Sequence, residues 1–357
     1  HNSKMATKVA RSLAKNVSQF EIPHTGIPII IRPFVVKKAN VVHPKVTGFQ
    51  VDLKAQWLTK TNLREGLPPS IFSQDESDDL STEHFLFLKE RMEKSLLQTT
   101  ANQKIGVNWK MNYDADLLES LFPSLLLQCW HLADNLKDSF LDFQPCIRTH
   151  WCRDHNFYQT MATPAYVVRT AKPLPLLEQD VNSTLEMDLP GPYRPVDLGV
   201  YSHPTNHLPN FPGYGDGCKT PYPAIMCLSD FTSQNQEQML HHGIHVMFSQ
   251  LVAIAMKQGY HTGQHLEEPM TTKCVVTNGQ VYMFMAYQLN TLSLQEDFGI
   301  KNIAWFDHFK TLYDGNSDPF KKGRKTFYEV FRTDTKRLKV NDEAIKALVA
   351  FLKHQTK

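Results

Sequence analysis

The chain has 357 residues, 41% of them hydrophobic, which suits one large or two moderate domains with a real core and excludes wholesale disorder. Its formal net charge is only +2, but Lys and Arg outnumber Asp and Glu by 11 to 3 in residues 1–70, trail by 14 to 26 in residues 71–300, and lead by 13 to 7 in residues 301–357. No apolar run approaches the length of a membrane span, and the six cysteines form no Cys-x-x-Cys pair, so we expect no membrane contact, no zinc knuckle and free thiols.

The N-terminal part of the chain is basic. Residues 1–20 hold four basic residues and no acid, a composition that resembles part of a mitochondrial transit segment. If upstream residues were removed, the same stretch would instead be a basic arm suited to phosphates. Residues 21–50 hold four prolines among short β-branched runs, which predicts an extended segment. We therefore expect residues 1–50 to form an extended basic N-terminal arm.

Residues 51–320 are expected to form a globular α+β body. We predict a short helix over 52–65 that ends at Gly66, and an acidic loop over 70–81. The further predicted elements are helices over 82–98 and 115–137, the second kinked at Pro123, and strands over 146–151, 157–163 and 165–170. Residues 172–223 are rich in Pro and Gly and predict a long loop of the kind that often serves binding.

The strongest patterns follow this loop. Residues 236–259 predict a long helix that ends at Gly259. Asn278-Gly279 is a type I′ turn signature that joins Val275–Thr277 to Gln280–Leu289 in a hairpin. Apolar residues occupy both faces of the outgoing strand, which predicts a central strand covered on each side by helices or by a partner.

The C-terminal part, residues 321–357, is predicted to be a basic segment followed by a helix with Asn341 or Asp342 as its N-cap. Cations contact phosphates, and aromatic faces stack on unpaired bases. The aromatic residues among these cations are Phe320, Phe327, Tyr328 and Phe331. The residues predicted to bind RNA are Lys4, Lys8, Arg11, Lys15, Arg32, Lys37, Lys38, Lys321, Lys322, Arg324, Lys325, Lys336, Arg337 and Lys339. The alternative is that these cations are merely solvated.

Few patterns point to catalysis. His241 and His245 have the i, i+4 spacing of two zinc ligands, but no Glu follows the first, as it would in a zinc protease helix. The glycine-rich stretch 213–220 misses the order of a phosphate loop. Gln288 and Asn290 end an apolar strand, where satisfying backbone hydrogen bonds is favoured over ligand contact. We expect no catalytic residues, no bound metal and no cofactor.

Two blocks resemble a known family. KAQWLTKTNLREGLPPSI (54–71) and VVTNGQVYMFMAYQLNTLSLQEDFGIKNIAWF (275–306) are similar to a family of sister proteins of the mitochondrial large ribosomal subunit. A weaker similarity lies in TPYPAIMCLSD (220–230). The resemblance implies a non-catalytic ribosomal component in the mitochondrial matrix, which contacts ribosomal RNA, other mitochondrial ribosomal proteins and a paralogous partner in a heterodimer.

The resemblance also implies structural or interface roles for particular residues. We predict that Trp57, Tyr282, Phe284, Gln288 and Asn290 contact the paralogous partner. The expected fold is α+β, a mixed sheet with a central hairpin covered by helices, an extended basic N-terminal arm and a C-terminal helix. Two alternatives remain open: a metal-dependent enzyme that uses the helix of His241 and His245, and an adaptor that binds only proteins.

Overall fold

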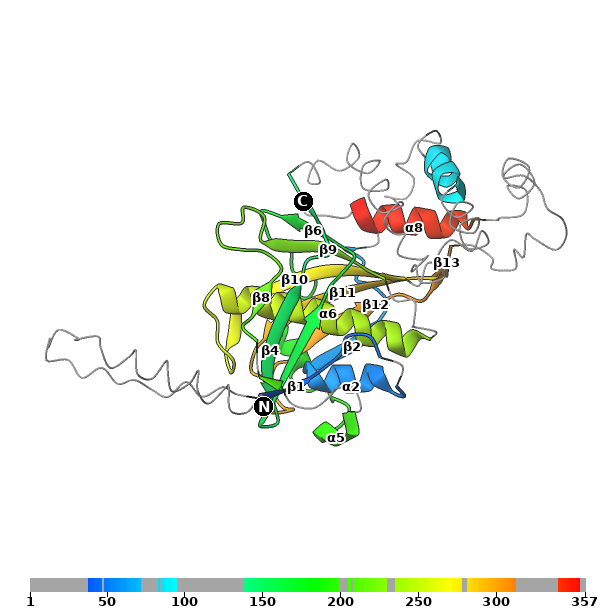
Figure 1. Ribbon diagram of the computed structural model, residues 1–357. Coiled ribbons are helices and arrows are strands. Elements are labelled where there is room, and N and C mark those ends of the chain that lie inside the picture. Colours follow the sequence, from blue (N-terminus) through cyan, green and yellow to red (C-terminus); the bar gives the residue numbers. More distant parts are fainter. Residues whose placement is uncertain are drawn as a thin grey trace, which may run out of the picture. The chain divides into compact units, whose positions relative to one another are not determined.

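The computed structural model of the chain (Figure 1) separates residues 1–36 from a second, larger unit, Lys37–Lys357. It describes residues 38–46, 48–71, 83, 85–94, 138–198, 205–206, 208–229, 235–277, 281–312 and 340–353. All of these belong to the second unit, so residues 1–37 of the predicted arm lie outside the described residues. The part of that arm from Lys38 on lies in the body, because β1 (Lys38–Val41) joins a sheet. The predicted domain boundaries otherwise stay a prediction.

The larger of two sheets has eight strands and mixes parallel with antiparallel pairs. Its order is β2 (Thr61–Glu65), β12 (Asn302–Phe306), β11 (Val281–Thr291), β10 (His265–Thr277), β9 (Tyr222–Ser229), β6 (Tyr166–Thr170) and β3 (Phe140–Phe143), with β13 (Lys310–Thr311) also on β11. The pairs β9–β10 and β2–β12 are parallel. This arrangement confirms the predicted α+β class with a mixed sheet.

The hairpin of β10 and β11 lies in the middle of this sheet (Figure 1). Met283, Met285 and Tyr287 point into one apolar cluster, and Tyr282 and Phe284 point into the other. The two-sided apolar strand is therefore confirmed, and elements of the same chain cover both of its faces.

The pairing register of the hairpin differs from the predicted one. Thr277 pairs with Tyr282, whereas a two-residue turn at Asn278-Gly279 would pair Thr277 with Gln280. Asn278 and Gly279 themselves lie outside the described residues. The offset is an even number of residues, so each side chain stays on its predicted face.

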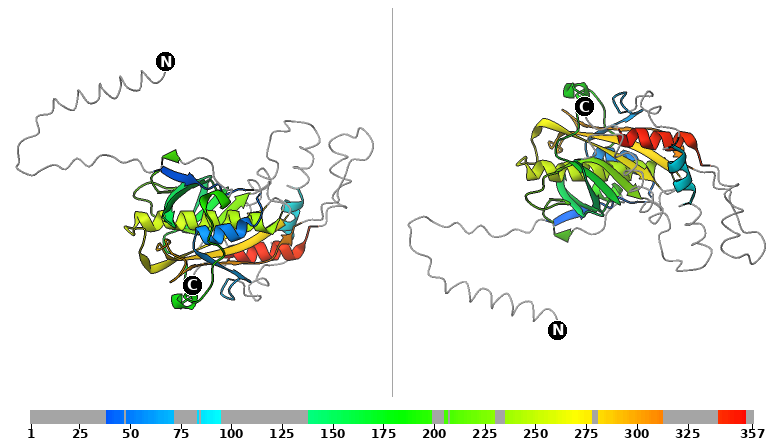
Figure 2. Two further views of the ribbon diagram at one scale, coloured as in Figure 1. Left: turned by 90° about the horizontal axis from the view of Figure 1, so that it is seen from below. Right: turned by 90° about the horizontal axis from the view of Figure 1, so that it is seen from above.

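The smaller sheet has five strands and lies across a long helix from the larger sheet (Figure 2). Its order is β7 (Thr205–Asn206), β1, β5 (Asn156–Ala162), β4 (Ile147–Arg153) and β8 (Phe211–Pro212). The helix α6 (Gln236–Lys257) contacts β4 and β8 on one side and β10 and β11 on the other. Because both sides are covered, α6 is buried almost all round, including its polar residues.

The helix α6 corrects the expectation that no segment is long and apolar enough to span a membrane. By length and composition it passes that test among the described helices, but 94% of its most apolar window is buried inside the protein. The Asn235 side chain accepts a hydrogen bond from the amide of Gln238 at its start, and Gly259 follows its end at a φ of +101°. The predicted helix over 236–259 is thus confirmed as a core helix.

The second face of the eight-stranded sheet carries α8 (Asp342–Lys353). The rings of Phe284 on β11 and Phe351 on α8 lie 5.0 Å apart. The carboxamide oxygen of Asn341 accepts from the amide of Glu343 at 3.0 Å, which confirms Asn341 as the cap. Residues 85–94 are helical within the predicted helix 82–98, and the predicted helix 115–137 lies outside the described residues.

The prediction of one helix over 52–65 is wrong in its second half. The helix α2 covers only Val51–Leu58, and Lys60 adopts a positive φ of 49° that ends it before β2 begins. Propensity favours helix there, but five residues of β2 pair with β12, and this tertiary pairing decides the outcome. The predicted strands over 146–170 are confirmed as β4, β5 and β6. The loop over 172–223 contains the short elements η3 (Val181–Thr184), α5 (Pro195–Leu198), β7 and β8, and β9 starts at its end.

Candidate functional site

The polar residues near the end of β11 are the most organised group among the described residues. The Gln288 carboxamide oxygen accepts from the amides of Leu177 and Glu178 at 2.9 and 3.0 Å. Its nitrogen donates to the Glu178 carbonyl and to the Asn290 carboxamide oxygen, both at 2.9 Å. Gln288 thereby holds the start of the Pro- and Gly-rich loop against the sheet by hydrogen bonds. The partners of its carboxamide nitrogen and oxygen are all groups of the same chain.

Asn302 on β12 continues this network toward α2. Its oxygen accepts from the amides of Asn290 and Thr291 at 2.9 and 3.0 Å, and its nitrogen donates to the Thr59 carbonyl at 3.0 Å. The two blocks that carry the family resemblance therefore meet here, because Thr59 lies in the first and Asn302 in the second.

Three buried cations, Lys60, Arg153 and Lys301, lie beside this network, and we call them the cation cluster. The Lys60 ammonium donates to the carbonyls of Ser293 and Phe298 at 2.9 and 2.7 Å. Such charge-assisted bonds to carbonyl oxygens replace the water that burial removes.

Arg153 and Lys301 also donate hydrogen bonds to backbone carbonyl oxygens near this network. Arg153 donates to the carbonyls of Trp57 and Leu294 at 2.8 and 2.7 Å and forms an ion pair with Asp297. The Lys301 ammonium donates to the carbonyls of Thr184, Leu185 and Gly299 at 3.1, 3.0 and 3.1 Å.

Together the cation cluster binds four carbonyl oxygens of residues 293–300, which we call the cation-held loop. Burial, followed by the charges of Arg153 and Lys301, lowers the pKa of Lys60 to about 8. Burial also lowers the pKa of Arg153 and of Lys301. Removing three cations from water is expensive, so the desolvation cost offsets part of the stability that these hydrogen bonds supply, while the bonds define one loop conformation.

The cation cluster was not predicted from the sequence. Lys60 and Lys301 lie inside the two blocks of family resemblance; Lys60 lies between the buried residues Thr59 and Thr61, and Lys301 lies between half-buried Ile300 and buried Asn302. An isolated lysine in a run of apolar and Thr residues is the signal that could have marked them.

The histidines of α6 lie in the core. The His241 ring nitrogens lie 3.0 and 3.1 Å from the carbonyl oxygens of Val51 and His43. The His245 ring centroid lies 4.4 Å from that of His241, and both His245 nitrogens lack a hydrogen-bond partner among the described residues. Burial and the two neighbouring histidines lower the pKa of His245 well below its usual value. Across the described residues no three His, Cys, Asp or Glu side chains come together as metal ligands, so the geometry gives no support to the metal-enzyme alternative.

The residues predicted to contact a partner all lie in the interior. Trp57, Tyr282, Phe284, Gln288 and Asn290 are each 5% exposed or less. In this fold they present no surface to another protein, because α6 and α8 cover the two faces of the hairpin. The burial supports structural roles for them, as the hydrogen bonds of Gln288 and Asn290 do.

Of the residues predicted to bind RNA, only Lys38 lies among the described residues, where it is exposed at the start of β1. The other thirteen lie outside the described residues, and their role stays a prediction.

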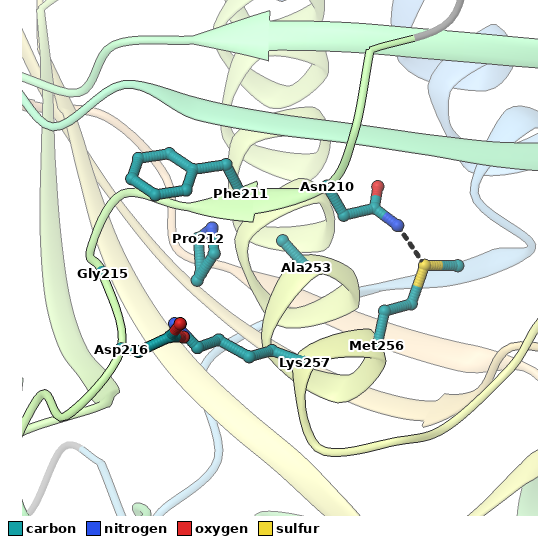
Figure 3. A pocket seen from close by; sticks show the side chains of 8 residues that line it. All are labelled: Asn210, Phe211, Pro212, Gly215, Asp216, Ala253, Met256 and Lys257. Atoms are coloured by element: carbon teal, nitrogen blue, oxygen red, sulfur yellow. Dashed lines mark hydrogen bonds and ion pairs between the residues drawn. The ribbon is translucent and has the colours of Figure 1, made fainter. Parts of the chain in front are cut away.

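The glycine-rich stretch 213–220 lines a hollow of about 380 Å³ at the end of α6 (Figure 3). Lys257 forms an ion pair with Asp216 at 2.9 Å there. A short strand, β8, precedes the stretch, but β9 follows it where a phosphate loop needs a helix. It is therefore a turn between strands and lacks the geometry of a nucleotide site.

The comparisons with known proteins agree with the resemblance. A family model described as mitochondrial 28S ribosomal protein S30 (PDCD9) matches residues 10–162 and 226–356. Relatives named large ribosomal subunit protein mL37 are 24% identical over 307 residues in Rattus norvegicus, 23% over 290 in Gallus gallus and 25% over 276 in Mus musculus. These matches cover 81, 77 and 73% of this chain, and 70, 65 and 63% of the relatives, so the chain spans about two thirds of their length.

The matched ranges include α2, β2, both strands of the central hairpin, the cation cluster and α8, so the similarity extends over the elements that build the core. The resemblance inferred from the two sequence blocks is confirmed. The chain belongs to the family of mitochondrial 28S ribosomal protein S30 (PDCD9), which is a family of ribosomal proteins and not of enzymes.

Proposed function

We propose that this chain is a structural component of the mitochondrial large ribosomal subunit and acts in the mitochondrial matrix. The observation that carries the proposal is the match of four relatives, all named for the large ribosomal subunit, to 73–81% of the chain. The family description carries a 28S name instead. We follow the relatives, because their names agree across four species.

The use of polar groups inside the fold supports a structural role. Gln288, Asn302 and the cation cluster direct their hydrogen bonds at the chain's own backbone, and His245 is sealed in the core. A catalytic group needs access to substrate and a partner that tunes it. The most organised polar groups of the described residues instead hold loops against the sheet.

Sedimentation of mitochondrial lysate tests this proposal. The tagged full-length chain is expected in the large-subunit fractions of a sucrose gradient, and its depletion is expected to reduce that peak. A chain found wholly at the top of the gradient would refute the ribosomal role.

We further propose that the basic ends contact ribosomal RNA. Each neutralised phosphate releases counterions, so binding through several cations weakens steeply as salt rises. The full chain with Lys321, Lys322, Arg324 and Lys325 changed to Gln is expected to lose crosslinks to RNA at that segment. If the unaltered chain forms no crosslink to RNA at any of the residues predicted to bind it, the protein-only adaptor is favoured.

A paralogous partner in a heterodimer is also proposed, but through a surface other than the buried hairpin. The outer strand β3 exposes Phe140, Leu141 and Phe143, of which Phe143 is 53% exposed. Large exposed apolar side chains on an edge strand mark a place for protein contact. Changing Phe140 and Phe143 to Lys is expected to abolish co-purification of the paralogue, and unchanged co-purification would exclude β3 as the contact.

A further inference from the structure

The cation-held loop exposes a large aromatic side chain at a fixed position. Phe298 is 73% exposed, while its own carbonyl oxygen accepts a 2.7 Å hydrogen bond from Lys60. The next carbonyl, of Gly299, accepts from Lys301. The backbone at this exposed ring and directly after it is thus bound to buried ammonium groups.

Burying cations has a desolvation cost that offsets much of the stability that their hydrogen bonds supply. Among the described residues, Asp297 is the one carboxylate that forms an ion pair with the cation cluster. What the arrangement does supply is a preorganised backbone. Binding residues that are already fixed lose less conformational entropy on association, and anchoring aromatic residues carry much of the energy of protein interfaces.

A second apolar side chain shares the same anchor. The Lys301 ammonium that holds Gly299 also holds the carbonyl of Leu185 at 3.0 Å, and Leu185 is 44% exposed. Lys301 therefore fixes both backbone segments, although they are more than a hundred residues apart in the chain.

The surroundings of these two side chains are acidic. Glu186 and Asp188 follow Leu185, Glu296 precedes Phe298, and all three are exposed. Neither 176–188 nor 293–300 contains a Lys or Arg, and Arg64 of β2, which approaches Met187, is paired with Glu178 at 3.1 Å. Carboxylates repel the phosphates of RNA and attract cations, so this surface suits a basic protein and not a nucleic acid.

We propose that Phe298 and Leu185, flanked by Glu186, Asp188 and Glu296, form a docking surface for a protein segment that is rich in Lys and Arg and carries an apolar socket. The residues of this surface differ from those of the hairpin, of β3 and of the basic ends. The inference does not depend on the ribosomal assignment, because it concerns the chemistry of the partner and not the particle.

Photocrosslinking from position 298 tests the proposal in living cells. Phe298 is replaced in the full-length chain by p-benzoylphenylalanine, and the crosslinked peptide is identified by mass spectrometry. The expected product is one protein segment with an excess of Lys and Arg. A crosslink to RNA, or to an acidic or neutral protein segment, would overturn the proposal. The absence of any crosslink would also overturn it, provided that footprinting reagents still reach the ring at position 298.

A binding measurement with the identified segment then separates docking from chance proximity. A synthetic peptide of that segment is titrated against the purified full chain. Phe298→Ser is expected to weaken binding about tenfold or more, from the lost burial of one aromatic side chain. Phe49→Ser is the matched control, because Phe49 is 76% exposed but lies before α2 and outside the proposed surface. The affinity of this variant for the peptide should stay within about twofold of the unaltered chain.

The acidic flank is tested with the same peptide. Changing Glu186 and Glu296 to Gln is expected to weaken binding and to flatten its dependence on salt. Equal affinity of the unaltered chain and the Phe298→Ser variant, with unchanged thermal melting of both, would refute the docking surface.

Discussion

Lys60 gives the chain a stability that depends on pH in a way that a substitution can isolate. In the variant Lys60→Met the side chain keeps a similar length but loses its charge and its donors. The carbonyls of Ser293 and Phe298 then lose their partner, and each buried unsatisfied acceptor costs about 1–3 kcal/mol. Loss of the buried charge offsets part of this, so we expect the variant to be less stable by about 1–3 kcal/mol at pH 7.

The sign of the pH effect follows from the direction of the pKa change. The folded chain holds the pKa of Lys60 at about 8, against 10.5 for an ordinary lysine. Between these values the unfolded chain binds more protons than the folded chain, so this residue makes folding more favourable as pH rises. Each pH unit between the two values corresponds to about 1.4 kcal/mol, which gives an upper bound of about 3 kcal/mol before solvent screening.

Urea denaturation of the unaltered chain and the variant at pH 7, 8, 9 and 10 measures this contribution as a difference. The difference is needed because burial raises the pKa of Cys227 to about 12, and buried thiols lower the stability of both proteins above about pH 9. We expect the advantage of the unaltered chain to grow by about 1–3 kcal/mol across this range. A difference that stays flat would refute the reasoning. Lys54→Met, within α2, is the control for removing a lysine that makes none of these hydrogen bonds.

Three further outcomes are expected. Gln288→Leu should lower the free energy of unfolding by about 2–5 kcal/mol in urea, because it leaves buried backbone groups without partners, whereas the exposed control Gln179→Leu should change it by less than about 0.5 kcal/mol. Gly243→Ala should lower the free energy of unfolding by about 1–3 kcal/mol, although Ala has the better helix propensity, because the added methyl group would lie 2.3 Å from the Met285 sulfur. In a double-mutant cycle, adding Met285→Ala should remove most of this penalty. His245→Phe should reduce the loss of stability between pH 6.5 and 5, because the lowered pKa keeps His245 neutral in the fold while the unfolded chain gains a proton there; equal acid sensitivity of both proteins would contradict this.

The sequence predicted the elements whose patterns are strong and local. The run from Gln236 to Lys257 carries its own cap signals, and the alternation along Val281–Leu289 fixes which face each side chain takes. Asn341 was identifiable as a cap because its side chain acts within the next turn. In these cases the information lies within a few residues of the feature.

Features that depend on distant residues could not be predicted in this way. Thr61–Glu65 is a strand because β12 lies beside it, and nothing local distinguishes it from the end of a helix. The sequence left open whether helices or a partner cover the faces of the hairpin, since no local pattern shows that α8 covers one of them. The burial of Arg153 and Lys301 likewise depends on carbonyl groups brought together by the fold.

The parallel pairing of β2 with β12 has a consequence for how the chain is made. Thr59 and Asn302, which are hydrogen-bonded at this seam, stand 243 positions apart. During synthesis, or during passage through a translocation pore from the N-terminus, α2 and β2 emerge long before the strand that completes them. Contacts between such distant residues are slow to form, so the early segments must wait with apolar surface uncovered. We therefore expect this chain to need chaperone protection of its first hundred or so residues until β12 has emerged.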